Sequence, residues 1–398
     1  MINYMDRLTL NQTAKRVMTE LDLDHAGYGK LEAVFSIAFA IGAVIAGWMV
    51  DRWNVWWLYP SAVAAWSLAG FATGLARTVE ALFICRALLG LMESGHWPCA
   101  LRTTQRLLPP EQRTLGNSIL QSGAAVGSIF TPLIVLGFLA WTGSWRPPFL
   151  VIGGLGLFWV VLWLALVKRH DLAGPAGEVG STAGTRPARQ AGPTFATILR
   201  DRRFWILALV VSSINCAWHF FRVWLPLFLQ DVHRYGTAQA NLFMSGYYLA
   251  TDAGALTAGF VALWLARRGA SVHRSRLIVF LGGALLTTLS LLTTQLSAGP
   301  LLLIVFLVIG FGALAVFPPY YSFSQELTVQ HQGKLSGSLG FISWSSVAVV
   351  QWLAGRSVKE TGSYALGLTF AGLTPLMGFL AVALFWGRKP EAVAGAGK

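Results

Sequence analysis

The chain has 398 residues, of which 55% are hydrophobic and only 12% are charged, and its mean hydropathy is +0.58. A soluble domain of average composition carries about 25% charged residues, so this composition excludes an ordinary soluble protein and indicates a polytopic membrane protein. The net charge of +13 does not predict nucleic-acid binding, because the basic residues stand in short clusters between apolar runs. We therefore expect a lipid bilayer, and no nucleic acid, around the chain.

Apolar stretches long enough to cross a membrane recur along the chain. A hydrocarbon core of about 30 Å needs about 20 apolar residues in helical form. Eleven stretches meet this length, at residues 30–50, 55–76, 80–101, 113–140, 147–168, 204–229, 237–266, 276–296, 300–325, 335–356 and 364–387. The segment before them, residues 1–17, predicts an incomplete first span. The fold class is therefore all-α and integral to the membrane, with twelve transmembrane helices of which the first is truncated at its N-terminus.

The first span is short because only six residues precede Arg7. If Arg7 lies near the middle of the bilayer, the helix needs about seven to ten more residues on its cytoplasmic side. Backbone donors and a terminal amine at that depth are costly. We expect the chain as it stands to insert or transport poorly.

The only long polar stretch divides the chain into two sets of six spans. Residues 169–203 are rich in Gly, Ala, Pro and Arg, a composition typical of a flexible, solvated linker. We expect an N-terminal half at 1–168, a cytoplasmic linker at 169–203, a C-terminal half at 204–387 and a tail at 388–398. The end of the linker, 195–203, has the spacing of a helix along the membrane surface, with a plain loop as the alternative. Two six-helix halves are typical of a transporter that rocks one half against the other.

Charge placement predicts the orientation. Most basic residues outside the spans fall in one alternate set of loops, at 51–52, 102–113, 168–203, 267–276 and 334. Cytoplasmic loops carry an excess of Lys and Arg. This set should therefore be cytoplasmic, together with the C-terminal tail, whereas the acidic loop at 20–24 should face the other side.

Two charges interrupt the apolar run at 81–101. Arg86 and Glu93 are seven residues apart, so they share one face of a helix. A single charge buried in lipid costs several kcal/mol, and such residues are functional by default. The alternative is a static ion pair that only fixes packing. The three cysteines lie in apolar segments without CxxC spacing or a nearby histidine cluster, which predicts packing and neither a metal nor a redox site.

Several short strings resemble a known family. They are NYMDR at 3–7, GWMVDR at 47–52, the Arg86 to Glu93 spacing followed by Pro98, PPEQR at 109–113, SWRPPF at 144–149, WLP at 224–226 and TDAG at 251–254. Together they resemble the major facilitator superfamily and, within it, the anion:cation symporter family, which includes bacterial hexuronate and galactonate transporters. The resemblance covers essentially the whole chain.

The resemblance implies a proton-coupled symporter that imports small carboxylate-bearing solutes, hexuronates or related sugar acids, by alternating access. It further implies a monomer in the bacterial inner membrane, with the proton as coupling ion and no other cofactor. The alternatives are an anion uniporter or exchanger for other carboxylates, or a membrane sensor of the same fold that does not transport. An enzyme is not expected, because the sequence shows no nucleophile motif, phosphate loop or metal-ligand spacing.

The family pattern assigns roles in the first half. Arg7 matches the arginine that holds the substrate carboxylate, for which a planar guanidinium is suited, and Tyr4 would hydrogen-bond the substrate. Asp6 and Glu93 match acids implicated in proton coupling, with Arg86 as the arginine that counters the effect of burial on Glu93. Asp6 and Arg7 point about 100° apart on a helix, so they cannot both face one spot.

A histidine and a loop motif are weaker candidates. His96 either shares the proton of Glu93 or is hydrogen-bonded inside the bundle. Gly47, Asp51 and Arg52 match the superfamily's cytoplasmic gating motif, although residues 53–56 lack the basic residues that usually follow.

The remaining candidates lie in later helices. Arg222 is either a second anion anchor or a side chain that extends to the outer interface near 230–234. Asp252 matches a family acid with a structural or gating role, at a tight helix crossing made by Gly254 and Gly259. Further candidates for binding sugar hydroxyls or a sugar ring are Gln121, Asn215, Ser343 and Trp344.

Overall fold

A computed structural model describes residues 1–107, 110–172, 195–327 and 332–387, and within these ranges the chain is helical without any strand. Eight helices of this part are long and apolar enough to cross a membrane. The predicted all-α membrane fold is confirmed. The N-terminal half contains α1 (Ile2–Glu20), α2 (His25–Arg52), α3 (Val55–Leu75), α4 (Val79–Glu93), α5 (His96–Leu107), α6 (Pro110–Thr142) and α7 (Arg146–Leu166).

The C-terminal half follows the linker. A short helix, η1 (Arg169–Leu172), and α8 (Phe195–Arg200) flank the part of the linker outside the described residues. The half itself contains α9 (Arg202–Asp231), α10 (Thr237–Arg267), α11 (Val272–Thr287), α12 (Ser290–Thr293), α13 (Pro300–Ala315), α14 (Phe317–Leu327), α15 (Gln332–Thr361) and α16 (Ala365–Phe385). The predicted helix at the end of the linker is therefore present over Phe195–Arg200, after which Asp201 caps α9 by accepting a hydrogen bond from the Arg203 amide at 2.8 Å.

Local signals explain where several helices begin. Asp24 caps α2 by accepting from the Gly27 amide at 2.6 Å, and Asn54 and Thr78 cap α3 and α4 in the same way. A capping side chain satisfies an amide that has no partner within the helix. These polar residues stand in the short breaks between apolar runs, which is why the run lengths predicted the helices well.

Three predicted spans are each two helices. The break most relevant to function separates α4 from α5, directly after Glu93, where residues 94–95 form a turn. Similar breaks separate α11 from α12 and α13 from α14. A break at mid-span leaves backbone groups without helical partners, which a membrane protein tolerates only where other protein groups or a cavity surround them.

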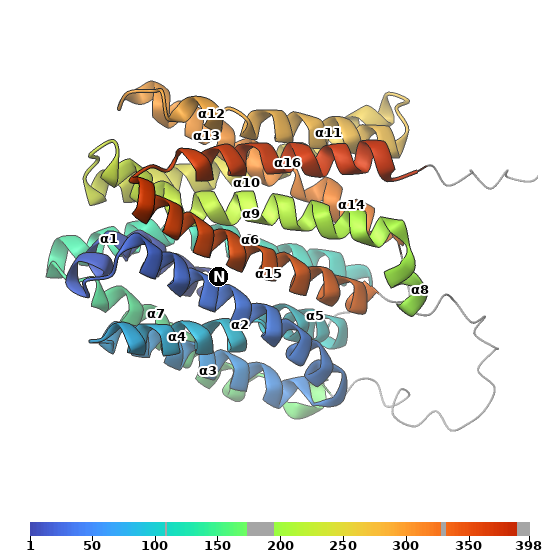
Figure 1. The fold of residues 1–398 in the computed structure, drawn as a ribbon. Helices are drawn as coiled ribbons and strands as arrows, with labels where there is room; N and C mark the ends of the chain where they lie inside the picture. Colours follow the sequence, from blue (N-terminus) through green and yellow to red (C-terminus); the bar gives the residue numbers. More distant parts are fainter. Residues whose placement is uncertain (108–109, 173–194, 328–331, 388–398) are drawn as a thin grey trace, which may run out of the picture.

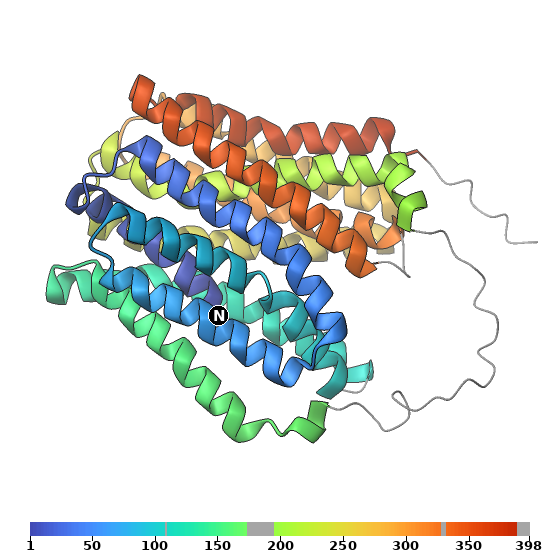
Figure 2. The same ribbon diagram turned by 60° about the horizontal axis from the view of Figure 1, so that its bottom comes forward.

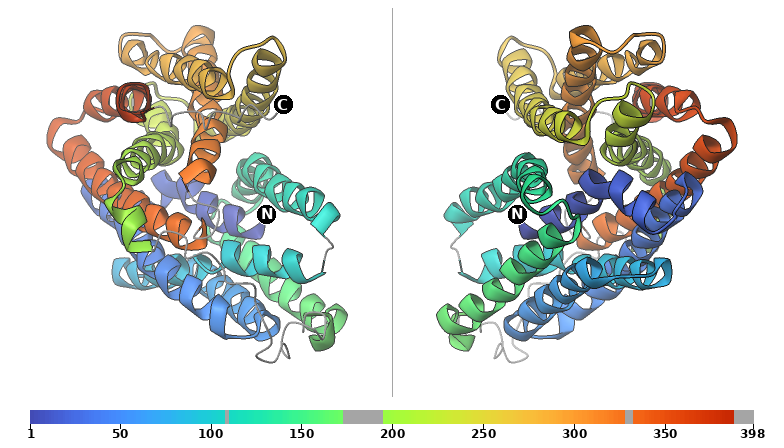
Figure 3. Two further views of the ribbon diagram at one scale, coloured as in Figure 1. Left: turned by 90° about the vertical axis from the view of Figure 1, so that its right-hand side faces the viewer. Right: turned by 90° about the vertical axis from the view of Figure 1, so that its left-hand side faces the viewer.

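The two halves lie side by side with their helices roughly parallel (Figure 1). Helix α2 runs along α15, α6 packs on α10, and α1 contacts α9, so these six helices form the interface between the halves. Figure 2 shows the α2–α15 contact from a second direction. In the end-on views the first helix and the N-terminus lie in the middle of the assembly, with helices of both halves around them (Figure 3).

The two halves are in close contact at the end where α1 meets α2. A Cβ atom on Gly29 of α2 would lie 2.5 Å from the Gln351 carbonyl oxygen and 2.8 Å from Gly355 Cα of α15, so only glycine permits this approach. Lys359 pairs with Asp24 at 2.8 Å across the same end. Helix α8 lies at the opposite end (Figure 1).

One carboxylate contacts three other helices at the end where α1 meets α2, which we call the closed end. Asp231, the last residue of α9, accepts hydrogen bonds from Lys15 of α1 at 2.8 Å and from Tyr364, at the start of α16, at 2.8 Å, and it contacts His25 Nε2 of α2 at 2.9 Å. Two of the three partners belong to the opposite half. We call Asp231 and these three partners the Asp231 cluster.

Candidate functional site

The centre of the interface holds a buried ion pair between the first helix and the end of α4. Arg7 Nε lies 2.5 Å from Glu93 Oε1, and the two side chains are 6% and 0% exposed. Glu93 is the last residue of α4, and a turn at residues 94–95 follows it. The structure therefore brings together the predicted carboxylate-binding arginine and the predicted proton-coupling acid.

Aromatic rings surround the Arg7 guanidinium. Its central carbon lies 4.7 Å from the ring centre of Phe39, 5.3 Å from Trp344 and 5.6 Å from Tyr4. Such positions over ring faces attract a cation. Because Trp344 belongs to α15, the C-terminal half contributes directly to the surroundings of Arg7. Two predicted site residues, Tyr4 and Trp344, thus lie at Arg7.

Arg86 forms its ion pair with Glu32 and not with Glu93, so its predicted influence on Glu93 does not act through a direct contact and stays a prediction. Arg86 Nη2 lies 2.5 Å from Glu32 Oε1 on α2, and both side chains are at most 2% exposed. Two residues on one helix face can each reach a different neighbouring helix, which the spacing along α4 does not reveal. Asn11 of α1 also donates to Glu32 Oε1, at 3.1 Å.

Arg222 reaches the same carboxylate from the C-terminal half. Its Nη2 atom lies 3.9 Å from Glu32 Oε2, and its side chain is 2% exposed. The alternative of an extended side chain at the outer interface is therefore not observed. Sequence reasoning missed Glu32, which the structure places between Arg86 and Arg222; the available signal was an acid at the start of an otherwise apolar span.

Asp6 points away from Arg7, as the 100° offset between adjacent helical residues predicts. Both of its carboxyl oxygens are buried and, among the described residues, have no hydrogen-bond partner. Asp6 packs on α3, where a Cβ atom on Gly70 would lie 2.7 Å from Asp6 Oδ1. A carboxyl without a partner is far less costly to bury when it is protonated.

The other candidates of the second half, Ser343 and Asn215, have hydrogen-bond partners within their own half. Ser343 and Asn215 both donate to the Val211 carbonyl, at 3.3 and 2.9 Å. Trp344 lies 4.5 Å, between ring centres, from His219 of α9. These contacts place the residues beside the α9–α15 interface.

Four predicted residues lie apart from the buried charges. His96 Nδ1 is 3.1 Å from the Tyr59 hydroxyl, and the structure does not bring it to Glu93. Arg52 lies over the Trp48 ring of its own helix at 4.3 Å, and a Cβ atom on Gly47 would meet nothing within 4 Å. Asp252 is partly buried on α10, and its Oδ2 atom has no hydrogen-bond partner among the described residues.

The tight crossing expected near Asp252 is present at Gly254 but not at Gly259. A Cβ atom on Gly254 would lie 2.0 Å from the Phe311 carbonyl oxygen of α13, whereas one on Gly259 would meet nothing within 4 Å. The side chains of Asp51 and Gln121 lie outside the described residues.

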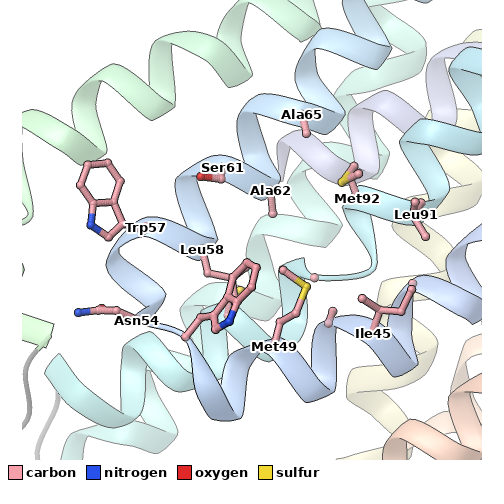
Figure 4. Close-up of a pocket in the computed structure, with 15 residues that line it drawn as sticks. Ile45, Met49, Asn54, Trp57, Leu58, Ser61, Ala62, Ala65, Leu91 and Met92 are labelled. Atoms are coloured by element: carbon pink, nitrogen blue, oxygen red, sulfur yellow. The ribbon is translucent and has the colours of Figure 1, made fainter.

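A cleft elsewhere in the first half is not the charged site. It measures about 720 Å³ and lies between α2, α3 and the α4–α5 break (Figure 4). Its lining is mostly apolar, with Met49, Trp57 and Met92 among its side chains, and it contains none of the buried charges. Within the described ranges no group of three His, Cys, Asp or Glu side chains is arranged to hold a metal ion.

Comparison with known proteins identifies the family. The family described as Major Facilitator Superfamily matches residues 1–351, which is most of the chain. The chain belongs to the Major Facilitator Superfamily. Its curated relatives include the probable L-galactonate transporter of Escherichia coli (strain K12), 25% identical over 98% of this chain and 87% of the relative. The hexuronate transporter of Bacillus subtilis (strain 168) is 27% identical over 96% of this chain and 91% of the relative.

Other relatives carry different solute names. The probable galactarate/D-glucarate transporter GudP of Bacillus subtilis (strain 168) is 25% identical over 97% of this chain and 89% of its own length. Among solved structures, a bacterial homolog of the human lysosomal transporter Spinster superposes with a TM-score of 0.76 at 16% identity, over 96% of this chain and 93% of that one. This superfamily protein is thus a multi-pass membrane transporter and not an enzyme.

Proposed function

We propose that this transporter is a proton-coupled symporter that imports small organic anions, hexuronates or related sugar acids, by alternating access. The observation that carries the proposal is the buried pair of Arg7 and Glu93, in contact at 2.5 Å. The relatives named for galactonate, hexuronate and glucarate transport support the solute class.

The pair couples anion binding to protonation through competition. A guanidinium makes charge-assisted, two-point contacts with a carboxylate, and in the structure Glu93 already occupies Arg7 Nε. A solute carboxylate that takes over this contact leaves the buried Glu93 without its counter-charge. A buried carboxylate in that position is stabilised by taking up a proton. The solute and the proton therefore bind together.

Neighbouring groups shape the site for a sugar acid. Tyr4 offers a hydroxyl for hydrogen bonding, and the Trp344 ring offers a face on which a sugar ring can stack. Asp6, buried on Gly70 without a partner, is a second proton carrier in this scheme.

In this scheme the closed end faces the outer side of the membrane. Under the positive-inside pattern, the end where α1 meets α2 faces outward and the linker faces the cytoplasm. The Asp231 cluster then closes the outer side, with the two halves at 1–168 and 204–387 able to rock about the interface. We place this protein as a monomer in a bacterial inner membrane with its C-terminus in the cytoplasm.

Uptake into proteoliposomes with an imposed pH gradient tests the proposal. Glucuronate, galacturonate and galactonate are offered outside, and the parent should accumulate at least one of them only when the gradient is present. Glu93→Gln should abolish uphill uptake while exchange persists. The matched control is Glu80→Gln, on the exposed face of the same helix, which should behave as the parent.

Other outcomes would identify the alternatives. Uptake that only equilibrates the solute and ignores the pH gradient would indicate a uniporter, and uptake that needs an anion on the other side would indicate an exchanger. Uphill uptake that survives in Glu93→Gln would remove Glu93 as the coupling acid. Binding without any transport would indicate a sensor. No interaction with any organic anion would overturn the assignment.

A further inference from the structure

We infer that Arg222 forms a second anion subsite and that the preferred solute therefore carries two negative charges, as an aldarate does with a carboxylate at each end. This inference rests on the proposed function and narrows its solute class. It starts from the charges that the described helices bring to the interface.

The first argument is a charge count. The interface buries three guanidinium groups, those of Arg7, Arg86 and Arg222. Their carboxylate contacts come from Glu93 and Glu32. When solute binding protonates Glu93, as the competition scheme requires, Glu32 alone remains to balance all three arginines.

Asp6 does not alter this count. Its carboxyl oxygens are buried without a partner in the described part of the chain, an arrangement that favours the protonated form. Two positive charges are then left without a counter-ion at a depth where unpaired charge is strongly unfavourable. A solute with one negative charge neutralises one of them, and a solute with two neutralises both.

The second argument is that Arg222 is the most weakly held of the three arginines. Its contact with Glu32 is 3.9 Å, whereas Arg86 contacts the same carboxylate at 2.5 Å and Asn11 donates to it at 3.1 Å. Arg222 Nε, like Arg86 Nε, is buried and has no hydrogen-bond partner among the described residues, so the long contact to Glu32 is what sets Arg222 apart. Glu32 is shared between two arginines, so Arg222 retains donors for a further anion.

The third argument is that a path of side chains joins Arg222 to Arg7. His219 lies one turn before Arg222 on α9, and its ring centre is 4.5 Å from that of Trp344. The Arg7 guanidinium lies 5.3 Å from the same Trp344 ring. His219 Nδ1 is also buried without a partner in the described ranges. An elongated solute with one end on Arg7 would extend its other end along this path.

A purely structural role makes a different prediction. If Arg222 only ties the halves together through Glu32, its loss would weaken the binding of all solutes alike. If Arg222 binds the second anionic group, its loss would weaken the dianion more than the monoanion. The ratio of the two affinities therefore separates the two roles.

The test uses glucarate and glucuronate, which share a carbon skeleton and differ by one carboxylate. Their dissociation constants are measured by titration calorimetry on the purified full chain. We expect the parent to bind glucarate about 10- to 100-fold more tightly, the range expected for one additional charge-assisted hydrogen-bonded contact. Arg222→Gln should reduce this ratio by a similar factor. The matched control is Arg356→Gln, an exposed arginine that pairs with Glu360 on the same helix, and it should leave the ratio unchanged.

Each result decides the question. A parent that binds glucuronate at least as tightly as glucarate overturns the inference while the proposed function stands. An equal loss of both affinities in Arg222→Gln also overturns it. If that variant does not fold, Glu32→Gln replaces it and should raise the ratio, because it frees Arg222 from its internal carboxylate; an unchanged ratio overturns the inference. A parent that binds neither solute overturns this inference and the proposed function together.

Discussion

Replacing Asp231 by asparagine should shift the transporter toward a state in which the closed end opens. Asp231 joins Lys15, His25 and Tyr364 through contacts of 2.8 to 2.9 Å, and its side chain is 25% exposed. A hydrogen bond to a charged group contributes about 1.5–3 kcal/mol when buried, whereas an exposed ion pair contributes about 0–1 kcal/mol. For three partly exposed contacts that asparagine retains only in part, we expect a loss of about 2 kcal/mol. That loss changes the ratio of closed to open states about 30-fold.

Double electron–electron resonance measures this shift as a change in the distance distribution between two spin labels. Suitable positions are Thr19 of α1 and Ala238 of α10, which are exposed near the closed end and belong to different halves. We expect a population at longer distance in Asp231→Asn that the parent lacks. The control is Glu360→Gln, which breaks an ion pair within α15 and none between the halves. Identical distance distributions for the parent and Asp231→Asn would refute the assignment of this cluster as a tie between the halves.

Three further changes test other parts of the account. Arg7→Lys keeps the charge but loses the two-point geometry, so solute affinity measured by calorimetry should fall about tenfold or more; unchanged affinity would remove the residue from the site. Gly254→Ala places a Cβ atom 2.0 Å from a carbonyl oxygen of α13 and should lower the free energy of unfolding by about 1–3 kcal/mol. Gly259→Ala, whose Cβ atom would meet nothing within 4 Å, should leave the free energy of unfolding unchanged. The hydrogen bond from Lys359 lowers the pKa of Asp24 below its ordinary value of 3.8. Asp24→Asn keeps the helix cap, so its stability deficit, under about 1 kcal/mol at this exposed site, should be present at neutral pH and vanish as the pH falls below that value; a deficit independent of pH would contradict the pairing.

Several helices were predictable from the sequence because their apolar runs begin next to polar capping residues. Residues such as Asp24, Asn54 and Thr78 mark helix starts in the sequence and act as caps in the structure. The break after Glu93 was not predictable, because the apolar run continues through it.

The sequence predicted which residues form the site, but not which of them form ion pairs with one another. Arg7, Glu93 and Arg86 all lie among the buried charges, as the spacing and the family resemblance indicated. Their partners come from other helices, so Glu32 and the Arg86–Glu32 contact needed the structure. The Asp231 cluster was missed for the same reason: its contacts join residues up to 216 positions apart in the chain.

The central claim is that a solute carboxylate and Glu93 compete for Arg7, so that binding the solute loads a proton. Proton uptake on binding tests it most directly, measured with a pH indicator when solute is added to the purified protein in weakly buffered solution. The account predicts net proton uptake by the parent, a solute affinity that rises as the pH falls, and loss of the uptake signal in Glu93→Gln. Solute binding seen by calorimetry without any proton uptake by the parent would contradict it.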